Sequence, residues 1–301
     1  MNRNNNTYII VYATVMVVVV ALVLAFASLK LQPLQNANVE NETKGAILTA
    51  IGEEGEMNTV KDKTAYINER YAKYIVEDFA VDCNGNRVEG ANAFDILKNL
   101  KAEYAKPEEQ RQLPVFVSRS DDGRTRYVLP LWGAGLWGPV WGYLALEDDW
   151  DTIYGAVFDH KSETPGLGAE IATPGFQDQF RGKTIFRNGQ FVSIGVTKGV
   201  GSSAGNPNAV DAISGGTITS RGVEKMLRDN LTDYKAFIEK QKSGLLSEGG
   251  AIAGAEASMT TLADHEAAAG GAEADSIESD GLADDDQEVE NQNNTNTESD
   301  E

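Results

Sequence analysis

The stretch from Tyr8 to Leu29 is the feature that most limits what this 301-residue chain can fold into. It is almost entirely apolar and contains an unbroken valine run at Val17–Val20. At a rise of about 1.5 Å per residue, a helix of that length covers about 33 Å, enough to cross a hydrocarbon core of about 30 Å. We therefore predict a membrane-spanning helix over 8–29, after a short N-terminal end at 1–7.

A cleaved signal peptide is the rival interpretation, because Ala25-Phe26-Ala27 resembles a small-residue cleavage site. The apolar stretch is longer than the roughly 7–15 residues of a signal core, and only Arg3 precedes it. We therefore expect a retained anchor. The flanking charges, Arg3 on one side and Lys30 and Lys44 on the other, favour no orientation strongly.

The net charge of −20 is concentrated at the C-terminal end. Sixteen of the 46 acidic residues follow Lys242, and no Lys or Arg does, so the rest of the chain has 30 acidic against 26 basic residues. Such a nearly neutral domain argues against nucleic-acid binding, which needs a basic surface to displace counterions. Residues 244–301 include no aromatic side chain. They cannot bury enough apolar area to offset their ordering entropy, so we predict a disordered acidic tail.

Cysteine and histidine are too scarce to support a metal or disulfide framework. The single Cys83 cannot form an intramolecular disulfide, so it does not indicate a compartment. The two histidines are His160 and His265, the second of which lies in the tail. These counts exclude a His/Cys metal cluster.

After a polar linker at 30–45, residues 46–243 are predicted to form one domain. Apolar residues at helical spacing predict an amphipathic helix over 91–104, and a second apolar stripe predicts a helix over 221–240. Between them lie short strand-like runs bounded by Gly, Pro or Asp. These runs are Val115–Val117, Tyr127–Leu129, Val140–Leu146, Ile153–Phe158, Thr184–Phe186 and Phe191–Val196. The pattern predicts an α+β domain on an antiparallel or mixed sheet.

The segment Asp211–Ser220 places two glycines directly before the last predicted helix. Hydroxyls at Thr217, Thr219 and Ser220 crowd the helix entrance, where free amides and the positive end of the helix dipole favour an anion such as phosphate. The same residues also suit an ordinary N-cap at Thr219 or Ser220 after a glycine turn.

The segment His160–Glu170 contains a Pro-Gly pair at Pro165 and Gly166 that favours a type II turn. Gly168 lets the backbone approach a flat ligand closely. An ordinary loop between strands explains the same residues.

Three of the four tryptophans lie within ten positions, interleaved with glycine, in the segment Leu131–Trp141. Aromatic faces beside flexible backbone suit a stacked ring ligand, and they equally suit packing against a sheet. The segment Lys198–Ser203 resembles a phosphate loop only loosely, because it lacks the spacing of a nucleotide-binding loop, and we interpret it as a simple loop.

These segments follow the apolar span in the order GLWG (135–138), ETPGLG (163–168) and SGGT (214–217). This order resembles the FMN-binding domain family, and within it the C subunits of the sodium-translocating NADH:quinone reductases. The resemblance covers residues 8 to about 240.

The resemblance implies that a flavin transferase joins one FMN per chain through its phosphate to Thr217. It implies an electron-carrier subunit, without a catalytic residue of its own, that works with the other subunits of a sodium-translocating NADH:quinone oxidoreductase. The domain would lie on the periplasmic side of the inner membrane, with residues 1–7 in the cytoplasm. The cofactor-binding residues so implied are Thr217, Ser214, Gly215, Gly216, Thr219, Glu163, Thr164, Pro165, Gly166, Leu167, Gly168 and Trp137.

One position departs from the family's pattern, which usually has alanine where Gly216 precedes the modified threonine. Thr219 is a second nearby hydroxyl, but the pattern places the attachment two residues earlier. Asp211 matches the family's acidic position and is interpreted as serving the transferase reaction, whereas His160 is interpreted as structural.

Two alternatives stay open at this point. The G subunit of the related ferredoxin:NAD oxidoreductase complex is similar in motif and topology, although the tryptophan-glycine stretch and the longer region before it favour the quinone-reductase subunit. An anchored binding or scaffold protein, in which the glycine turns are only structural, is an alternative of a different class.

Overall fold

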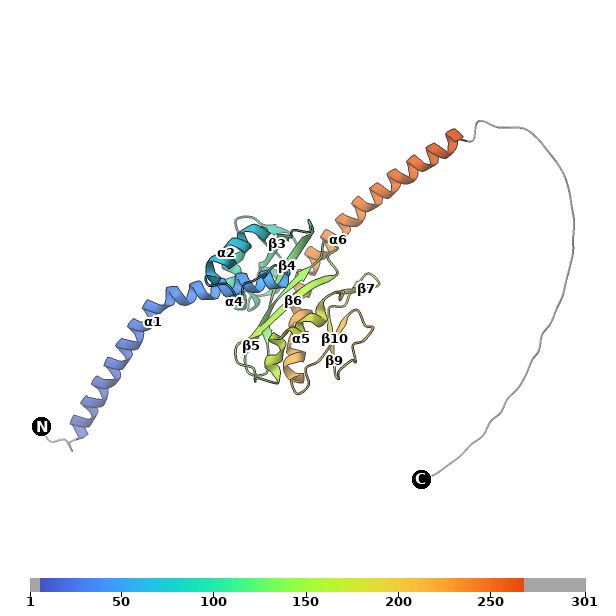
Figure 1. The fold of residues 1–301 in the computed structure, drawn as a ribbon. Coiled ribbons are helices and arrows are strands. Elements are labelled where there is room, and N and C mark those ends of the chain that lie inside the picture. Colours follow the sequence, from blue (N-terminus) through green and yellow to red (C-terminus); the bar gives the residue numbers. More distant parts are fainter. Residues whose placement is uncertain (1–5, 268–301) are drawn as a thin grey trace, which may run out of the picture. The chain divides into compact units, whose positions relative to one another are not determined.

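The computed structural model describes residues 6–267, and the chain divides into two units after Gly249. Figure 1 shows the order of its helices and strands. The α-helices are α1 (Asn6–Ala50), α2 (Lys63–Tyr74), α3 (Ala93–Lys98), α4 (Leu100–Tyr104), α5 (Pro174–Gln177) and α6 (Thr217–Ala267). Short 3₁₀ helices are η1 (Glu108–Gln110), η2 (Gly168–Ala172) and η3 (Asp178–Phe180).

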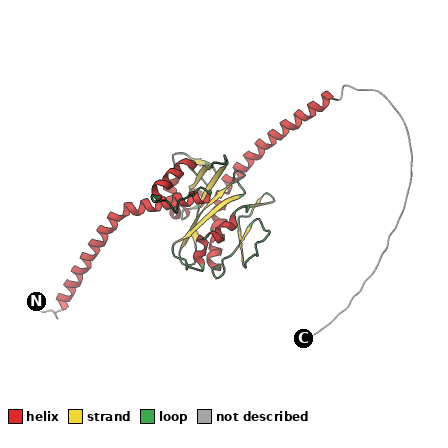
Figure 2. Cartoon of the chain, viewed as in Figure 1, coloured by secondary structure: helices red, strands yellow, loops and turns green. Residues whose placement is uncertain are grey.

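The main sheet has six strands in the order β2-β1-β3-β4-β5-β6, and every neighbouring pair is antiparallel. Figure 2 shows the strands in yellow and the helices in red. Its strands are β1 (Ile75–Val81), β2 (Arg87–Val88), β3 (Leu113–Arg119), β4 (Thr125–Ala134), β5 (Pro139–Leu146) and β6 (Ile153–His160). Two small sheets accompany it: an antiparallel pair, β7 (Phe186–Arg187) with β8 (Gln190–Phe191), and a parallel pair, β9 (Gly195–Thr197) with β10 (Ala209–Asp211). The predicted α+β class is therefore confirmed.

Alternate residues of the strands face two separate apolar clusters, as the two-residue period of a strand requires. On β5, Leu144 packs in the cluster that includes α6, whereas its neighbours Tyr143 and Ala145 pack in the cluster that includes the end of α1. The residues that α6 buries are Val223, Met226, Leu227, Leu231, Tyr234, Phe237 and Ile238. The sheet is thus the middle layer, with α6 on one face and α1 and α2 on the other.

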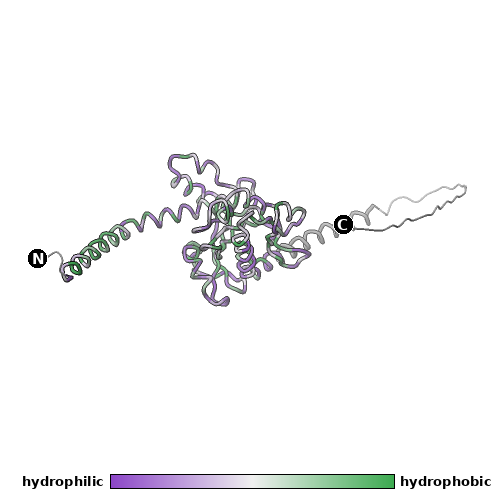
Figure 3. The backbone as a smooth tube through the Cα atoms, turned by 90° about the horizontal axis from the view of Figure 1, so that it is seen from below, coloured by the Kyte–Doolittle hydropathy of each residue, from purple (hydrophilic) through white to green (hydrophobic). Residues whose placement is uncertain are grey.

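Among residues 6–267, α1 is the one helix long and apolar enough to cross a membrane, with a mean hydropathy of 3.0 in its most apolar window. Figure 3, coloured by residue hydropathy, shows that the most hydrophobic residues of α1 lie in its first part. The helix does not end at Leu29 but continues through the expected linker at 30–45. Its last residues, including Ile47 and Leu48, are fully buried in the domain core.

Four of the predicted strands lie within β3, β4, β5 and β6, and the predicted last helix lies within α6. That helix begins four residues earlier than expected, at Thr217 instead of Arg221. The single helix predicted over 91–104 is wrong, because Asn99 leaves the helical region at φ −117° and ψ 24° and separates α3 from α4.

The strand predicted at Phe191–Val196 is also wrong as a continuous element. Ser193 has a φ of 59°, which no regular strand allows, so the run divides into β8 and β9. The run predicted at Thr184–Phe186 contributes only Phe186 to a strand, and Thr184 forms an isolated bridge with Thr152.

The acidic tail expected over 244–301 is described only in part. The structure describes residues 244–267 as a continuation of α6, and residues 268–301 lie outside the described residues. The disorder expected for the tail therefore stays a prediction.

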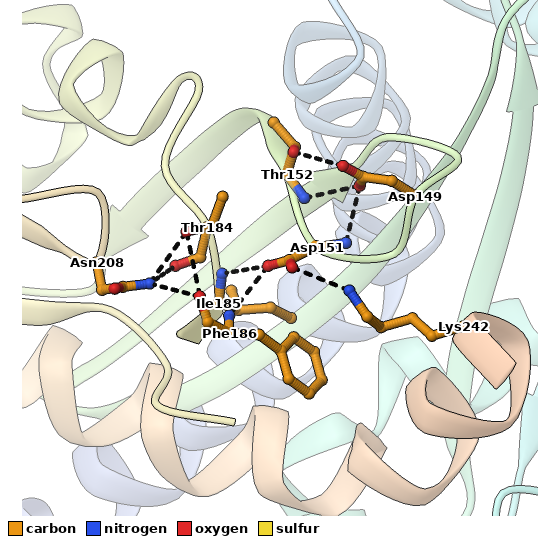
Figure 4. Close-up of polar contacts among 8 residues, drawn as sticks. All are labelled: Asp149, Asp151, Thr152, Thr184, Ile185, Phe186, Asn208 and Lys242. Atoms are coloured by element: carbon orange, nitrogen blue, oxygen red, sulfur yellow. Dashed lines mark hydrogen bonds and ion pairs between the residues drawn. The ribbon is translucent and has the colours of Figure 1, made fainter. Parts of the chain in front are cut away.

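A polar network holds the small strands against the main domain (Figure 4). One carboxylate oxygen of Asp151 accepts the backbone N–H groups of Ile185 and Phe186, each at 3.0 Å, and the other oxygen pairs with Lys242 of α6 at 2.9 Å. The side-chain amide of Asn208 donates to the backbone oxygen of Phe186 at 3.1 Å. This network fixes the start of β10, and β10 leads directly into the glycine turn before α6.

Candidate functional site

Three segments that are far apart in the sequence meet around one cavity of about 280 Å³. They are the turn between β4 and β5, the loop after β6, and the first turn of α6 with the residues before it. The lining residues are Leu136, Trp137, Glu163, Thr164, Leu167, Gly168, Gly215, Gly216, Thr217, Ile218 and Thr219. The three sequence motifs therefore form one site.

Most of the residues implied by the resemblance line this cavity, but three do not. Ser214, Pro165 and Gly166 lie in the same segments without lining it. Gly166 has a φ of 74°, as the expected Pro-Gly turn requires, and its N–H donates to Glu170 at 3.1 Å. The proposed contact of these three residues with a cofactor stays a prediction.

Thr217 is the first residue of α6 and is half-buried in the cavity wall. The first N–H groups of a helix have no partner within the helix, and the helix dipole is positive at this end. Gly215 turns the chain into the helix with a φ of 75°, and a side chain there would also collide with Leu167. The arrangement presents backbone donors at the position where the sequence predicts a phosphate.

The other two hydroxyl groups at the helix entrance are engaged by the protein. Thr219 is buried, and its hydroxyl donates to Glu163 at 2.6 Å. Ser220 is buried too, and its hydroxyl accepts the N–H of Ile213 at 3.0 Å and donates to the carbonyl of Gly216 at 2.9 Å. Within residues 6–267, no side-chain or backbone hydrogen bond engages the hydroxyl of Thr217.

Glu163 is only 5% exposed, and its carboxylate joins two of the three segments. One oxygen accepts the backbone N–H of Trp137 at 2.8 Å, and the other accepts the Thr219 hydroxyl. The backbone N–H of Glu163 itself donates to Nδ1 of His160 at 3.2 Å, so His160 supports the loop from behind.

The three clustered tryptophans divide between the two uses that the sequence left open. Trp137 lines the cavity and is 66% exposed. Trp132 and Trp141 stack on each other, with ring centroids 5.9 Å apart and an interplanar angle of 13°. Trp137 is thus the member of the group that is available to a ring ligand.

Leu136 and Ile218 line the cavity although they were not among the predicted site residues. Both side chains are exposed, at 46% and 60%. The available signal was a large apolar residue within a motif, between Gly135 and Trp137 for Leu136 and between Thr217 and Thr219 for Ile218. Sequence patterns usually assign a large apolar residue to the protein core, so they do not indicate that such a residue is exposed at a binding site.

Asp211 does not line the cavity but fastens the segment at 198–203, which is a loop as the sequence predicts and lies between β9 and β10. Its carboxylate accepts the N–H of Ser203 at 2.7 Å, the N–H of Gly201, and the hydroxyl of Ser202 at 3.3 Å. These hydrogen bonds, that from the Ser203 backbone first, lower the pKa of Asp211 to about 2. The structure therefore gives Asp211 a local role in shaping the surface beside the site.

Comparison with known proteins matches residues 135–232 to the FMN-binding domain, a range that contains all three motifs. The chain is 30% identical over 240 residues to the C subunit of Na(+)-translocating NADH-quinone reductase of Haemophilus ducreyi, covering 75% of this chain and 90% of that protein. It is 32% identical over 227 residues to the protein of the same name from Vibrio anguillarum, covering 70% of this chain and 85% of that protein.

Solved structures agree with these sequence matches. The crystal structure of the C subunit of Na(+)-translocating NADH-quinone reductase from Parabacteroides distasonis has 42% identity and a TM-score of 0.58, covering 69% of this chain and 96% of that chain. The crystal structure of NqrC from Shewanella oneidensis has 27% identity and a TM-score of 0.56, covering 67% and 97%. The chain therefore belongs to the family of C subunits of the Na(+)-translocating NADH-quinone reductases.

Proposed function

We propose that this chain is an electron-carrier subunit of a sodium-translocating NADH:quinone oxidoreductase and that FMN is bound covalently at Thr217. The names of its relatives and the description of the matching domain support the complex and the cofactor. The observation that supports the attachment residue is the free hydroxyl of Thr217 in the cavity, beside two hydroxyls that the protein already uses. The other subunits of the complex are the expected partners.

The residues around the cavity fit FMN in shape and chemistry. The cavity volume of about 280 Å³ lies just below the range of about 300–1,000 Å³ for small-molecule sites, so the cavity would hold part of the cofactor. At Gly215, Gly216 and Gly168 the absence of a side chain lets the backbone lie close to the cavity wall, where a Cβ atom would collide with neighbouring residues. Amides at the entrance of α6 suit a phosphate, and the apolar side chains of Leu136 and Trp137 suit a flat ring.

In this proposal the protein holds and orients the cofactor. The first turn of α6 would stabilise the charge of the phosphate, while Leu136, Trp137 and Ile218 would exclude water from one side of the ring. FMN supplies reversible electron transfer when bound, and the surrounding protein tunes its potential. No acid or base on the chain is needed for that role.

The attachment reaction needs help from another protein. The oxygen of Thr217 would bond to the phosphorus of an activated flavin nucleotide, whose nucleotide leaving group departs as the hydroxyl proton is removed. Within residues 6–267, no carboxylate or histidine contacts the Thr217 hydroxyl, so the base would come from the flavin transferase. This division of labour agrees with the expected role of a transferase in maturation.

The attachment residue is tested by intact mass and peptide mapping of protein made together with an active transferase. Thr217→Val keeps the shape of the side chain without the hydroxyl and should remove the covalent flavin, whereas Thr217→Ser should keep it. Thr232→Val is the matched control, because Thr232 is an exposed threonine of α6 that does not line the cavity, and its loss should leave the covalent flavin in place. Covalent flavin that persists in the Thr217→Val chain, or that is absent from the wild type, would overturn the proposal.

We also propose that α1 anchors the chain in the inner membrane, with the domain on the periplasmic side. The length and hydropathy of α1 support the anchor, and the side follows only from the resemblance. A phosphatase that is active only outside the cytoplasm, fused after residue 243, should be active. An inactive enzyme together with bright fluorescence of a cytoplasmic reporter at the same position would reject the orientation.

A further inference from the structure

The buried carboxylate of Glu163 holds two walls of the cavity at a fixed separation. It accepts the backbone N–H of Trp137 in the β4–β5 turn at 2.8 Å and the hydroxyl of Thr219 in the first turn of α6 at 2.6 Å. No Lys, Arg or His side chain in the described part of the chain forms an ion pair with it. Burying a carboxylate costs free energy unless its oxygens accept hydrogen bonds. The Glu163 carboxylate therefore favours the arrangement in which both Trp137 and Thr219 donate to it.

A glycine lies beside each of the two carboxylate oxygens of Glu163, where a larger residue would collide with it. A Cβ atom at Gly135 would lie 2.4 Å from one oxygen of Glu163, and a Cβ atom at Gly168 would lie 2.4 Å from the other. The Cβ of Gly168 would also lie 2.4 Å from the hydroxyl oxygen of Thr219. Both glycines are therefore explained by the position of one side chain from the loop after β6.

We propose that Glu163 is a positioning residue of the FMN site. Its carboxylate fixes the β4–β5 turn against α6 and occupies the hydroxyl of Thr219, which leaves the hydroxyl of Thr217 as the acceptor for the flavin phosphate. This inference rests on the proposed function, because it assigns a role in attachment to a residue that does not react.

Direct binding of the flavin by the Glu163 carboxylate is the competing role. Its 5% exposure leaves little of the side chain for a ligand, and both oxygens already have donors from the protein. A carboxylate also has no N–H or O–H to donate when ionised. The geometry therefore favours an action through Trp137 and Thr219.

Two substitutions separate the effect of the negative charge of Glu163 from the effect of its two hydrogen bonds to Trp137 and Thr219, which we call the bridge. In Glu163→Gln, the amide oxygen can still accept from Trp137, while the amide nitrogen donates to the hydroxyl of Thr219, so covalent flavin should stay within about twofold of the wild type. In Glu163→Ala the bridge is lost, and the flavin-carrying fraction should fall at least tenfold. Glu170→Gln is the matched control, because Glu170 lies in the same region and contacts only its own loop.

A loss of folding must be distinguished from a loss of positioning. Ile67→Ala removes apolar contacts from the core cluster on the face of the sheet opposite α6, and Ile67 does not line the cavity, so this variant serves as a destabilised control. Its flavin-carrying fraction should stay close to that of the wild type at a temperature where both are folded. An equal loss in Ile67→Ala and Glu163→Ala would mean that Glu163 acts only through stability, which would overturn the inference.

The bridge can also be measured without any flavin. In a Thr217→Val background, the amide of Trp137 should exchange with solvent at least tenfold faster when Glu163 is changed to Ala than when it is changed to Gln. Unchanged exchange and a wild-type flavin fraction in Glu163→Ala would overturn the inference. Absence of covalent flavin from the wild-type chain would instead overturn the proposed function, while the exchange experiment still decides whether the bridge exists.

Discussion

Gly168→Ala tests the packing of the site most directly, because it places one methyl group inside the hydrogen bond between Glu163 and Thr219. The new Cβ would lie 2.4 Å from an oxygen of each side chain and 3.1 Å from the Cβ of Thr219. A hydrogen bond to a charged group contributes about 1.5–3 kcal/mol, and overpacking costs about 1–3 kcal/mol. We expect the variant to lose about 2–5 kcal/mol of unfolding free energy. At about 2–4 °C per kcal/mol for a domain of this size, the melting temperature should fall by about 4–20 °C.

Gly166→Ala is the matched control, two residues away in the same motif. Gly166 has a φ of 74°, so alanine there is strained by about 1–2 kcal/mol, but no atom lies within 4 Å of its Cβ position. Thermal melting of the two full-length variants, followed by circular dichroism, should give Gly168→Ala a lower melting temperature than Gly166→Ala. Its flavin-carrying fraction, measured by mass, should also be lower. Equal melting temperatures, or the reverse order, would refute the packing that we assign to Glu163.

Three further predictions concern the surroundings of the site. The pKa of Asp211 is lowered to about 2, so the hydrogen bonds from the 198–203 loop to its carboxylate are complete above about pH 4 and are lost as the pH falls toward 2. Asp211→Asn should weaken the hydrogen bond of the Ser203 amide already at neutral pH, which NMR of that amide would detect. Gly222→Ala should lower the melting temperature and shift α6, because its Cβ would meet the carbonyl oxygen of Ala134 at 2.4 Å. Tyr234→Phe should cost about 1–2 kcal/mol in chemical denaturation, because the buried hydroxyl that donates to the backbone carbonyl of Pro114 in β3, with Pro130 of β4 as a longer second acceptor, is lost.

The elements that the sequence predicted well are those with a strong period in apolar residues. The stripe from Val223 to Ile238 is buried against the sheet as expected, and Val140–Leu146 alternates between the two faces of β5. The strand β1 was not predicted, because Glu77 and Asp78 interrupt its apolar pattern and are exposed in the structure. Its hydrogen bonds to β3 come from tertiary pairing, which no local pattern records.

The breaks within predicted elements have a different cause. Asn99 and Ser193 interrupt a helix and a strand through their backbone conformations. Asn and Ser are both common where helices and strands are interrupted, but the sequence does not say at which Asn or Ser the chain will be interrupted. These conformations are chosen by the packing of the flanking segments, which is known only once the fold is known.

The site itself was predictable as a set of segments but not as a geometry. The resemblance pointed to Thr217, Glu163 and Trp137, and all three line one cavity. The hydrogen bond between Glu163 and Thr219 joins residues 56 positions apart and depends on how β6 and α6 pack. The resemblance placed the attachment at Thr217 and not at Thr219, but the sequence did not show that the Thr219 hydroxyl is bonded to Glu163.

The exposure of the cavity gives a physical reason for a covalent tether in the proposed function. Sites for freely bound small molecules usually bury about 70–90% of the ligand. Here Trp137 is 66% exposed and Ile218 is 60% exposed, so the rim of the cavity leaves much of a bound ring open to solvent. A phosphodiester at Thr217 would keep the local flavin concentration high by connectivity instead of burial. The open side then stays available to the cofactors of neighbouring subunits, which a deep pocket would exclude.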